Sequence, residues 1–215
     1  KKNIIDFYKI PPEKVDCAYN GVNFERFSRA YSAEEKENIR KKYILPEKFL
    51  LYIGTLQPRK NIPAVIEALK DLDIKLVLAG NRKAHNFDPK IDETIEKNNL
   101  ANKIIFPGWI DEDDKPALLQ MAECFVFPSL YEGFGIPLIE AMAAGTPVVC
   151  SGIPVLREIG KDAALFCEEK NSREFAENIS KILADENSRN NLIEKGKNNA
   201  QNFTWQKSAE KTLEA

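Results

Sequence analysis

Two adjacent cations, Arg59 and Lys60, stand in the loop GTLQPRKN (54–61), directly after a short apolar run. Arginine offers a forked set of donors and lysine a point charge, a combination that suits a polyphosphate. The alternative is a pair of solvated cations in a surface loop, but a glycine turn at the end of a predicted strand favours an anion site. Asn61 closes the loop, and we expect its side chain to cap the helix that follows.

A glycine-rich segment, PSLYEGFGIPLIE, occupies residues 128–140. Gly133 and Gly135 allow the backbone to approach a ligand without a Cβ clash, and Pro137 suits the first turn of a helix. The pattern is not a dinucleotide fingerprint, because Leu138 stands where the third glycine would be, and it is not a Walker loop, because no G-K-[ST] follows. The amides expected to be free to face an anion are those near Gly135, Ile136 and Leu138.

Glu132 and Glu140 bracket the glycine turn, one in the loop and one about a turn into the predicted helix. Both carboxylates can therefore point into one crevice, where they would accept hydrogen bonds from vicinal hydroxyls such as those of a sugar or a ribose. For Glu140 alone, an interaction with the helix dipole would be a sufficient explanation. The presence of both glutamates around one glycine turn favours a binding role.

Two further segments carry weaker signals. FPGWI (106–110) follows another predicted strand, and its backbone at Trp109 and Ile110 can offer an amide and a carbonyl to a nucleobase edge. Asp111 and Asp113 match the D-x-D pattern that holds a metal ion in some enzymes, but acidic residues also favour the start of a helix. We expect a helix start at these aspartates and no metal site.

The composition excludes several classes of protein. The 215 residues are 43% hydrophobic and 30% charged, which is too apolar for a disordered chain. The net charge of -2 lacks the cationic surplus of a nucleic-acid-binding protein, so we expect no nucleic-acid partner. Four widely spaced cysteines and a single histidine, His85, fit neither a disulfide scaffold nor a metal cluster. We expect Cys124, Cys150 and Cys167 to be buried free thiols.

The elements that must position these residues alternate from residue 48 onward. Apolar runs rich in β-branched and aromatic residues predict strands, and helical spacing of apolar residues lies between them. This alternation is typical of a parallel sheet covered on both faces, so we predict a doubly wound α/β (Rossmann-like) domain that binds ligands beyond the carboxyl ends of its strands. The predicted strands are 49–53, 75–79, 104–106, 125–127, 148–150 and 165–167.

The flanks of the chain differ from this alternation. Residues 1–45 predict a helix, a short strand at 15–18, a loop and a charged helix near 34–42. Beyond residue 170 the pattern is helical throughout, with a last segment after Thr204 and Trp205.

Several segments together match a known family pattern. They are NGVN (20–23), the loop at 54–61, FPS (127–129), the E-x7-E pair of Glu132 and Glu140, EAMAAGTPVV (140–149) and FTW (203–205). These segments resemble the nucleotide-sugar-binding C-terminal domain of the retaining glycosyltransferases of family four, the group-one transferases. Such enzymes have two facing Rossmann-like domains, the GT-B fold, and the resemblance runs through most of this chain.

The resemblance implies a role for each matching residue. Arg59 and Lys60 would neutralise the donor diphosphate and stabilise the departing nucleotide, and with Glu132 they would be the catalytic residues. Glu140 would bind the ribose. The other implied donor-binding residues are Gly54 and Thr55 in the first loop, Trp109 and Ile110 at the base, Gly133, Phe134 and Gly135 in a hexose-binding turn that includes Glu132, and the amides of Ile136 and Leu138 near the phosphates. No metal ion or other cofactor is expected.

The resemblance also implies a division of the chain. Residues 1–20 would be the end of an N-terminal domain and its connection, 21–200 the donor-binding domain, and 201–215 a helix that crosses back toward the N-terminal domain. A glycan or lipid-linked acceptor would bind through that other domain, which makes this chain part of a longer protein. We expect a cytoplasmic location, with peripheral association of the full-length protein at the inner face of the membrane.

The loop at 54–61 most resembles mannosyltransferase-like members, so we expect GDP-mannose as the donor, with a UDP-sugar next, in polysaccharide or glycolipid synthesis. Two alternatives stay open. A sugar-nucleotide epimerase or a phosphorylase on a related scaffold would need a different acidic and histidine set or a cofactor lysine. A non-catalytic nucleotide-sugar-binding protein would use the same residues as the transferase.

Overall fold

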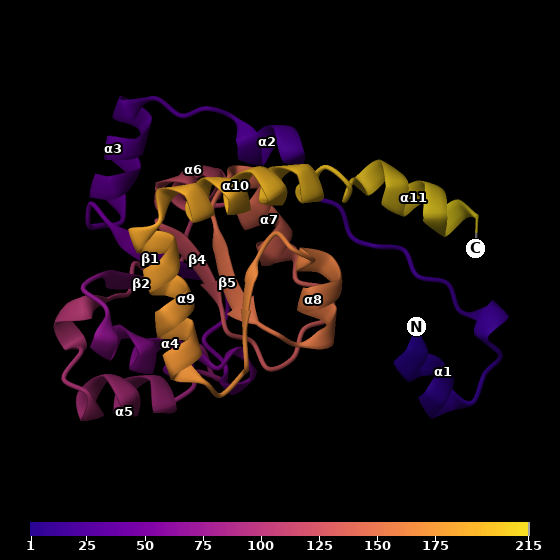
Figure 1. Ribbon diagram of the computed structural model, residues 1–215, viewed down its shortest axis with the longest axis horizontal. Helices are drawn as coiled ribbons and strands as arrows, with labels where there is room; N and C mark the ends of the chain where they lie inside the picture. The colour runs from indigo at the N-terminus through magenta and orange to yellow at the C-terminus, as the bar shows by residue number, and fades with distance from the viewer. Residues whose placement is uncertain (215) are drawn as a thin grey trace.

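A parallel sheet forms the centre of the computed structural model, which describes residues 1–214 (Figure 1). Within these residues six strands pair in the order β3-β2-β1-β4-β5-β6, all in parallel. The strand order reverses between β1 and β4, so the carboxyl ends of these two strands form the switch point at which such sheets bind ligands. The strands are β1 (Phe49–Ile53), β2 (Lys75–Ala79), β3 (Ile104–Ile105), β4 (Cys124–Phe127), β5 (Val148–Ser151) and β6 (Leu165–Cys167).

The predicted doubly wound α/β fold is confirmed. β1, β2 and β6 have the predicted bounds, and the other three strands differ by one residue at one end. The agreement is close because strands covered on both faces are continuously apolar, and such runs stand out from the polar loops around them.

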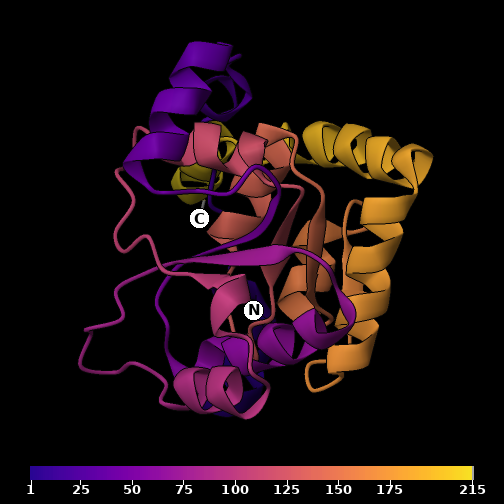
Figure 2. The same cartoon turned by 90° about the vertical axis from the view of Figure 1, so that its left-hand side faces the viewer.

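Helices cover both faces of the sheet (Figures 1 and 2). α4 and α5 pack together on one face, where α4 also contacts α9. α6 and α7 pack together on the other face, where α7 also contacts α2 and α10. These helices are α2 (Phe24–Ser28), α4 (Ile62–Ala68), α5 (Lys90–Lys97), α6 (Lys115–Met121), α7 (Ile136–Ala144), α9 (Ser172–Ala184) and α10 (Glu186–Ala200). Helix α8 (Pro154–Gly160) was not predicted, because seven residues show too little periodicity.

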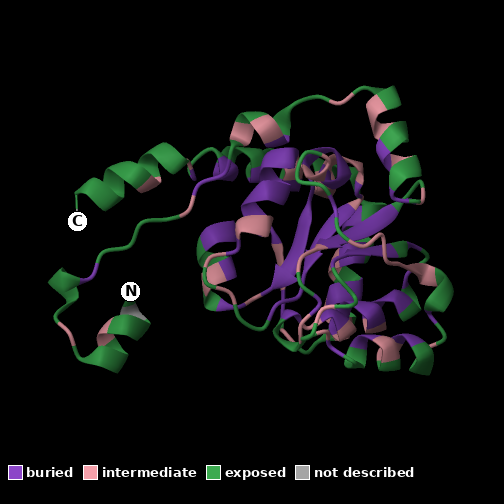
Figure 3. Ribbon diagram, turned by 180° about the vertical axis from the view of Figure 1, so that it is seen from behind, coloured by how far each residue is buried: buried purple, intermediate pink, exposed green. Residues whose placement is uncertain are grey.

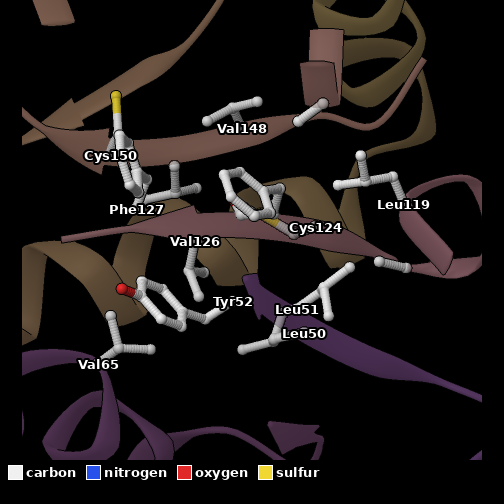
Figure 4. Packing of buried hydrophobic residues seen from close by; sticks show 14 of the residues in the cluster. Leu50, Leu51, Tyr52, Val65, Leu119, Cys124, Val126, Phe127, Val148 and Cys150 are labelled. Atoms are coloured by element: carbon white, nitrogen blue, oxygen red, sulfur yellow. Dashed lines mark hydrogen bonds between the residues drawn. The ribbon is translucent and has the colours of Figure 1, made fainter. Parts of the chain in front are cut away.

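The core lies on both sides of the central strands. Leu50 and Leu51 of β1, like Phe127 of β4, are fully buried, and Figure 4 shows them packed between neighbouring strands and helices. In Figure 3 the central strands, such as β4 and β5, are buried along their length, whereas the outer faces of the helices are exposed. A sheet buried in this way is a rigid platform for the loops at its carboxyl edge.

The cysteines behave as predicted. Cys124, Cys150 and Cys167 are free and buried in β4, β5 and β6, and burial raises the pKa of each thiol. Cys17 is free and exposed. The three buried thiols therefore act as small apolar core residues.

The flanking helices are α1 (Lys2–Tyr8), α3 (Ala33–Lys42) and α11 (Trp205–Leu213), and Figures 1 and 3 show α1 and α11 extending away from the sheet with most of their surface exposed. The predicted strand at 15–18 is wrong for the described residues: this segment pairs with no other strand, and an isolated strand has no partner for its backbone hydrogen bonds. No helix in residues 1–214 has the length and apolar character needed to span a membrane.

Candidate functional site

The loops that follow β1 and β4 lie side by side at the switch point. The Leu130 amide donates to the Arg59 carbonyl at 2.8 Å, which joins the two loops directly. Asn61 does not cap α4 as predicted: its backbone is left-handed, with φ 52°, and its side chain makes no capping bond. Instead, its amide nitrogen donates to the carbonyl oxygens of Pro128 at 3.2 Å and Glu169 at 2.6 Å. Asn61 thus ties together the loops after three strands, β1, β4 and β6.

The structure brings Arg59, Lys60 and Glu132 together. The Lys60 ammonium pairs with Oε1 of Glu132 and lies 5.1 Å from the centre of the Phe127 ring. Arg59 Nη1 lies 3.5 Å from the same carboxylate oxygen and donates to the Tyr131 carbonyl at 3.2 Å. Lys60 is buried, whereas the Arg59 side chain is 46% exposed. Two cations share one carboxylate, so the cluster keeps a net positive charge.

Burial has a direct electrostatic effect on this cluster. Loss of water around Lys60 lowers its pKa, although the Glu132 carboxylate acts in the opposite direction. An ammonium held in such a site gains from any additional negative charge nearby. The cluster can therefore accept a diphosphate without first losing its carboxylate partner.

The glycine turn offers backbone donors next to this cluster. The amides of residues 133–136 donate to no acceptor within the described chain. Gly135 has φ 101°, in the left-handed region that favours glycine. The Leu138 amide is not free as predicted, because it donates to the Gly135 carbonyl at 2.9 Å and closes the first turn of α7. The predicted amides of Gly135 and Ile136 are therefore available to an anion, together with those of Gly133 and Phe134, whereas the Leu138 amide is not.

Glu140 pairs with a residue that the sequence analysis missed. Its Oε2 lies 2.8 Å from Nζ of Lys115, an ion pair by distance without the alignment of a hydrogen bond. Burial raises the pKa of Glu140, and Lys115 partly opposes that shift. The only sequence signal for Lys115 is its place at the start of a helix near the predicted base-binding turn.

Of the two predicted base-binding residues, Trp109 lines an open groove of about 630 Å³. Trp109 is 73% exposed, whereas Ile110 is buried and does not line this groove. Arg82, which the sequence analysis did not select, also lines the groove, and its guanidinium lies 4.7 Å from the centre of the Phe106 ring. An exposed indole beside a stacked guanidinium gives flat apolar surface for a planar ring.

The acidic segment before α6 does not start the helix as predicted, because α6 begins at Lys115. Its carboxylates form ion pairs instead. Lys42 Nζ lies 2.6 Å from both Asp111 Oδ2 and Asp114 Oδ2, and Arg26 pairs with Asp113 at 3.3 Å. These contacts anchor the loop that carries Trp109 and Ile110.

The remaining predicted residues, Gly54 and Thr55, lie at the carboxyl end of β1. The Gly54 amide donates to the Ala79 carbonyl at 3.0 Å, which holds the ends of β1 and β2 together, and Thr55 is exposed. A further residue was missed here: Ser129, next to β4, is fully buried and its hydroxyl makes no hydrogen bond within the described residues.

Comparison with known families agrees with this arrangement. Residues 35–199 match the family described as "Glycosyl transferases group 1". The chain belongs to this family of glycosyltransferases. A curated member, O-antigen chain mannosyltransferase B of Escherichia coli, is 29% identical over 221 residues, which cover 100% of this chain and 57% of that protein. The serotype-specific mannosyltransferase WbdA of E. coli is 32% identical over 221 residues. The match covers 99% of this chain and 27% of WbdA.

Solved structures of the same fold cover the whole of the domain. A glycosyltransferase from Rickettsia africae superimposes with a TM-score of 0.89 at 24% identity, over 99% of this chain and 59% of its own. Anabaena HepE, solved with UDP and glucose, gives a TM-score of 0.85 at 19% identity, over 99% of this chain and 59% of its own. The chain thus spans a little over half the length of these structures and of the mannosyltransferase B relative.

Proposed function

We propose that this chain binds a nucleoside diphosphate sugar and forms the donor half of a retaining hexosyltransferase. The observation that carries the proposal is the cluster of Arg59, Lys60 and Glu132 beside the unoccupied amides of residues 133–136, all at the switch point of the sheet. Arg59, Lys60 and the amide of Ile136, fixed before the reaction, would stabilise the charge that develops on a departing diphosphate. Glu132 would contact the hexose, and Glu140 the ribose.

The same proposal extends to the substrates of the full-length protein. GDP-mannose is our first candidate donor, because O-antigen mannosyltransferases are among the relatives, and a UDP-sugar is the second, because HepE has been solved with UDP. The acceptor would be a glycan or a lipid-linked glycan in polysaccharide or glycolipid synthesis. No metal ion is required in this scheme, since Arg59 and Lys60 supply the positive charge at the diphosphate.

The proposal is tested by calorimetric titration of the 215-residue chain with GDP, UDP, GDP-mannose and UDP-glucose. Arg59→Ala should weaken the binding of each of these ligands about tenfold. This is the lower end of the effect expected for losing a charge-assisted hydrogen bond, because the Arg59 side chain is partly exposed. The matched control is Lys48→Ala, which removes an exposed cation from the opposite end of β1 and should leave the affinities unchanged.

Glu132→Gln separates recognition of the sugar from recognition of the nucleotide. Removing the carboxylate leaves both cations in place, so GDP and UDP should bind as tightly as to the wild-type chain or more tightly. The nucleotide-sugar should lose its advantage over the free nucleotide. Failure of the wild-type chain to bind any of the four ligands, or equal effects of Arg59→Ala and Lys48→Ala, would refute the proposed function.

A further inference from the structure

Three aromatic rings from distant parts of the sequence meet directly behind the glycine turn. They are Tyr19, in the segment that leads to α2, Phe134, in the turn itself, and Phe203, between α10 and α11. The ring centres lie 5.8 Å apart for Tyr19–Phe134 and 5.9 Å apart for the other two pairs. We call this group the aromatic triad. Tilted and edge-on rings at these distances attract one another beyond their apolar burial.

Two members of the aromatic triad are fixed to the rest of the fold. The Tyr19 hydroxyl donates to the carboxylate of Glu158 on α8, and Phe203 is buried. The Val22 amide donates to the Phe203 carbonyl at 2.9 Å, which joins the two flanking segments. Gly21 makes this approach possible, because a Cβ at that position would lie 2.2 Å from the Trp205 nitrogen.

The third member, Phe134, belongs to the turn whose amides are free. Its neighbour Gly135 rests against α8, where a Cβ would lie 2.7 Å from Leu156 Cδ2. Gly133 has no such support, since no protein atom lies within 4 Å of the Cβ position. The ring of Phe134 is therefore a second side chain, after Glu132 with its ion pairs, through which the body of the domain can hold this end of the turn.

We infer that Tyr19 and Phe203 are positioning residues that act through Phe134 to hold the turn at residues 133–135 in place for the sugar half of the donor. The identity of the ligand in this inference rests on the proposed function. The effect of Tyr19 and Phe203 on the turn, which we call the mechanical link, is a property of the chain alone and does not depend on that function. In Figure 1 α10 leads into α11, which extends away from the sheet, and α8 lies below the end of α10 at the right of the domain.

The variants Tyr19→Leu and Tyr19→Phe form a matched pair. Leucine removes the ring from the triad, whereas phenylalanine keeps the ring and removes only the hydrogen bond to Glu158. Tyr19 is 46% exposed, so neither change should prevent folding. In Tyr19→Leu the affinity for the nucleotide-sugar should fall about three- to tenfold while that for the free nucleotide stays within about twofold, and Tyr19→Phe should restore the wild-type ratio.

A second measurement needs no ligand. Backbone order parameters of residues 133–135, measured by amide ¹⁵N relaxation, should be lower in Tyr19→Leu and in Phe203→Leu than in the wild-type chain, and Tyr19→Phe should keep the wild-type values. Unchanged order parameters in both leucine variants would overturn the inference even if donor binding is found. If the order parameters fall as expected but no nucleotide binds, the proposed function fails and the mechanical link stands.

Discussion

Lys115 Nζ lies 2.8 Å from Oε2 of Glu140, and the two side chains are only 14% and 11% exposed. The pair joins the start of α6 to α7 on one face of the sheet. Since an unpaired buried carboxylate is costly, Lys115 favours the ionised form of Glu140 and opposes the rise in its pKa that burial causes. An ionised Glu140 is the form that accepts hydrogen bonds from a pair of ribose hydroxyls.

Lys115→Met should destabilise the chain by about 2 kcal/mol, because it leaves the Glu140 carboxylate buried without a partner. The double variant Lys115→Met with Glu140→Gln should recover most of this loss, since it removes the uncompensated charge. Urea unfolding followed by circular dichroism measures both. The control is Lys41→Met, which removes an exposed lysine paired with Glu37 at 3.8 Å and should change the stability by less than about 0.5 kcal/mol. Equal stability of Lys115→Met and the control would contradict the role of the pair.

Glu140 also predicts a pH dependence of donor binding. Burial raises its pKa above the ordinary glutamate value of about 4.3, so its carboxylate is protonated at a higher pH than an exposed one. The affinity for a nucleotide-sugar should therefore fall as the pH decreases through this raised pKa.

The contribution of Glu140 to the free energy of unfolding changes with pH in the opposite direction. Because its pKa is higher in the folded than in the unfolded chain, Glu140 favours folding below its unfolded pKa. This contribution is lost as the pH rises through the pKa of the folded chain.

This pH dependence is measured by titrating the chain with a nucleotide-sugar between about pH 4.5 and pH 8. A nucleotide-sugar is preferred because free nucleotides carry a terminal phosphate that itself titrates near about pH 6. Glu140→Gln should bind more weakly at neutral pH and show a flat profile. If the variant keeps the slope of the wild-type chain, a group other than Glu140 is responsible for it.

The fold could largely be predicted because most of its strands are recognisable from short runs of apolar residues in the sequence. β1, with Leu50 and Leu51 at its centre, is recognisable from five consecutive apolar or aromatic residues. The segment 15–18 is apolar except for Asp16 but has no strand partner among residues 1–214, so local propensity alone gave the wrong assignment. An apolar run becomes a strand only where a neighbouring strand pairs with it, and the local sequence pattern does not show whether such a partner exists.

The loops that form the site could be predicted from the sequence, but the contacts between their side chains could not. Arg59, Lys60 and Glu132 were selected because each lies in a loop directly after a predicted strand, where such sheets bind ligands. The partner of Glu140 could not be selected in this way, because Lys115 comes from a helix start 25 residues earlier whose direction depends on packing. The same limit applies to Asn61, whose side chain bridges loops instead of capping a helix.

Chelation should leave nucleotide binding unchanged. In the acidic segment after the base-binding turn, Asp111 and Asp114 are already paired with the ammonium of Lys42, and Asp113 is paired with Arg26. Their pairing keeps the carboxylates from acting as free metal ligands, and Arg59 and Lys60 provide the charge that a metal ion would otherwise supply. Calorimetry of GDP and UDP binding with and without EDTA tests this expectation. A loss of affinity with EDTA that added Mg²⁺ or Mn²⁺ restores would return the acidic segment to the site.

Gly133 and Gly135 should respond differently to alanine. Gly135→Ala forces a side chain onto a residue with φ 101° and into contact with Leu156, so it should destabilise the chain by about 1–2 kcal/mol. Gly133→Ala meets no protein atom within 4 Å and should leave the stability within about 0.5 kcal/mol. Because its new methyl group projects from the turn proposed to contact the hexose, it should weaken nucleotide-sugar binding about tenfold and spare the free nucleotide. Thermal unfolding and calorimetry on the two variants measure the contrast, and wild-type affinity of Gly133→Ala for the nucleotide-sugar would show that the ligand does not approach the turn.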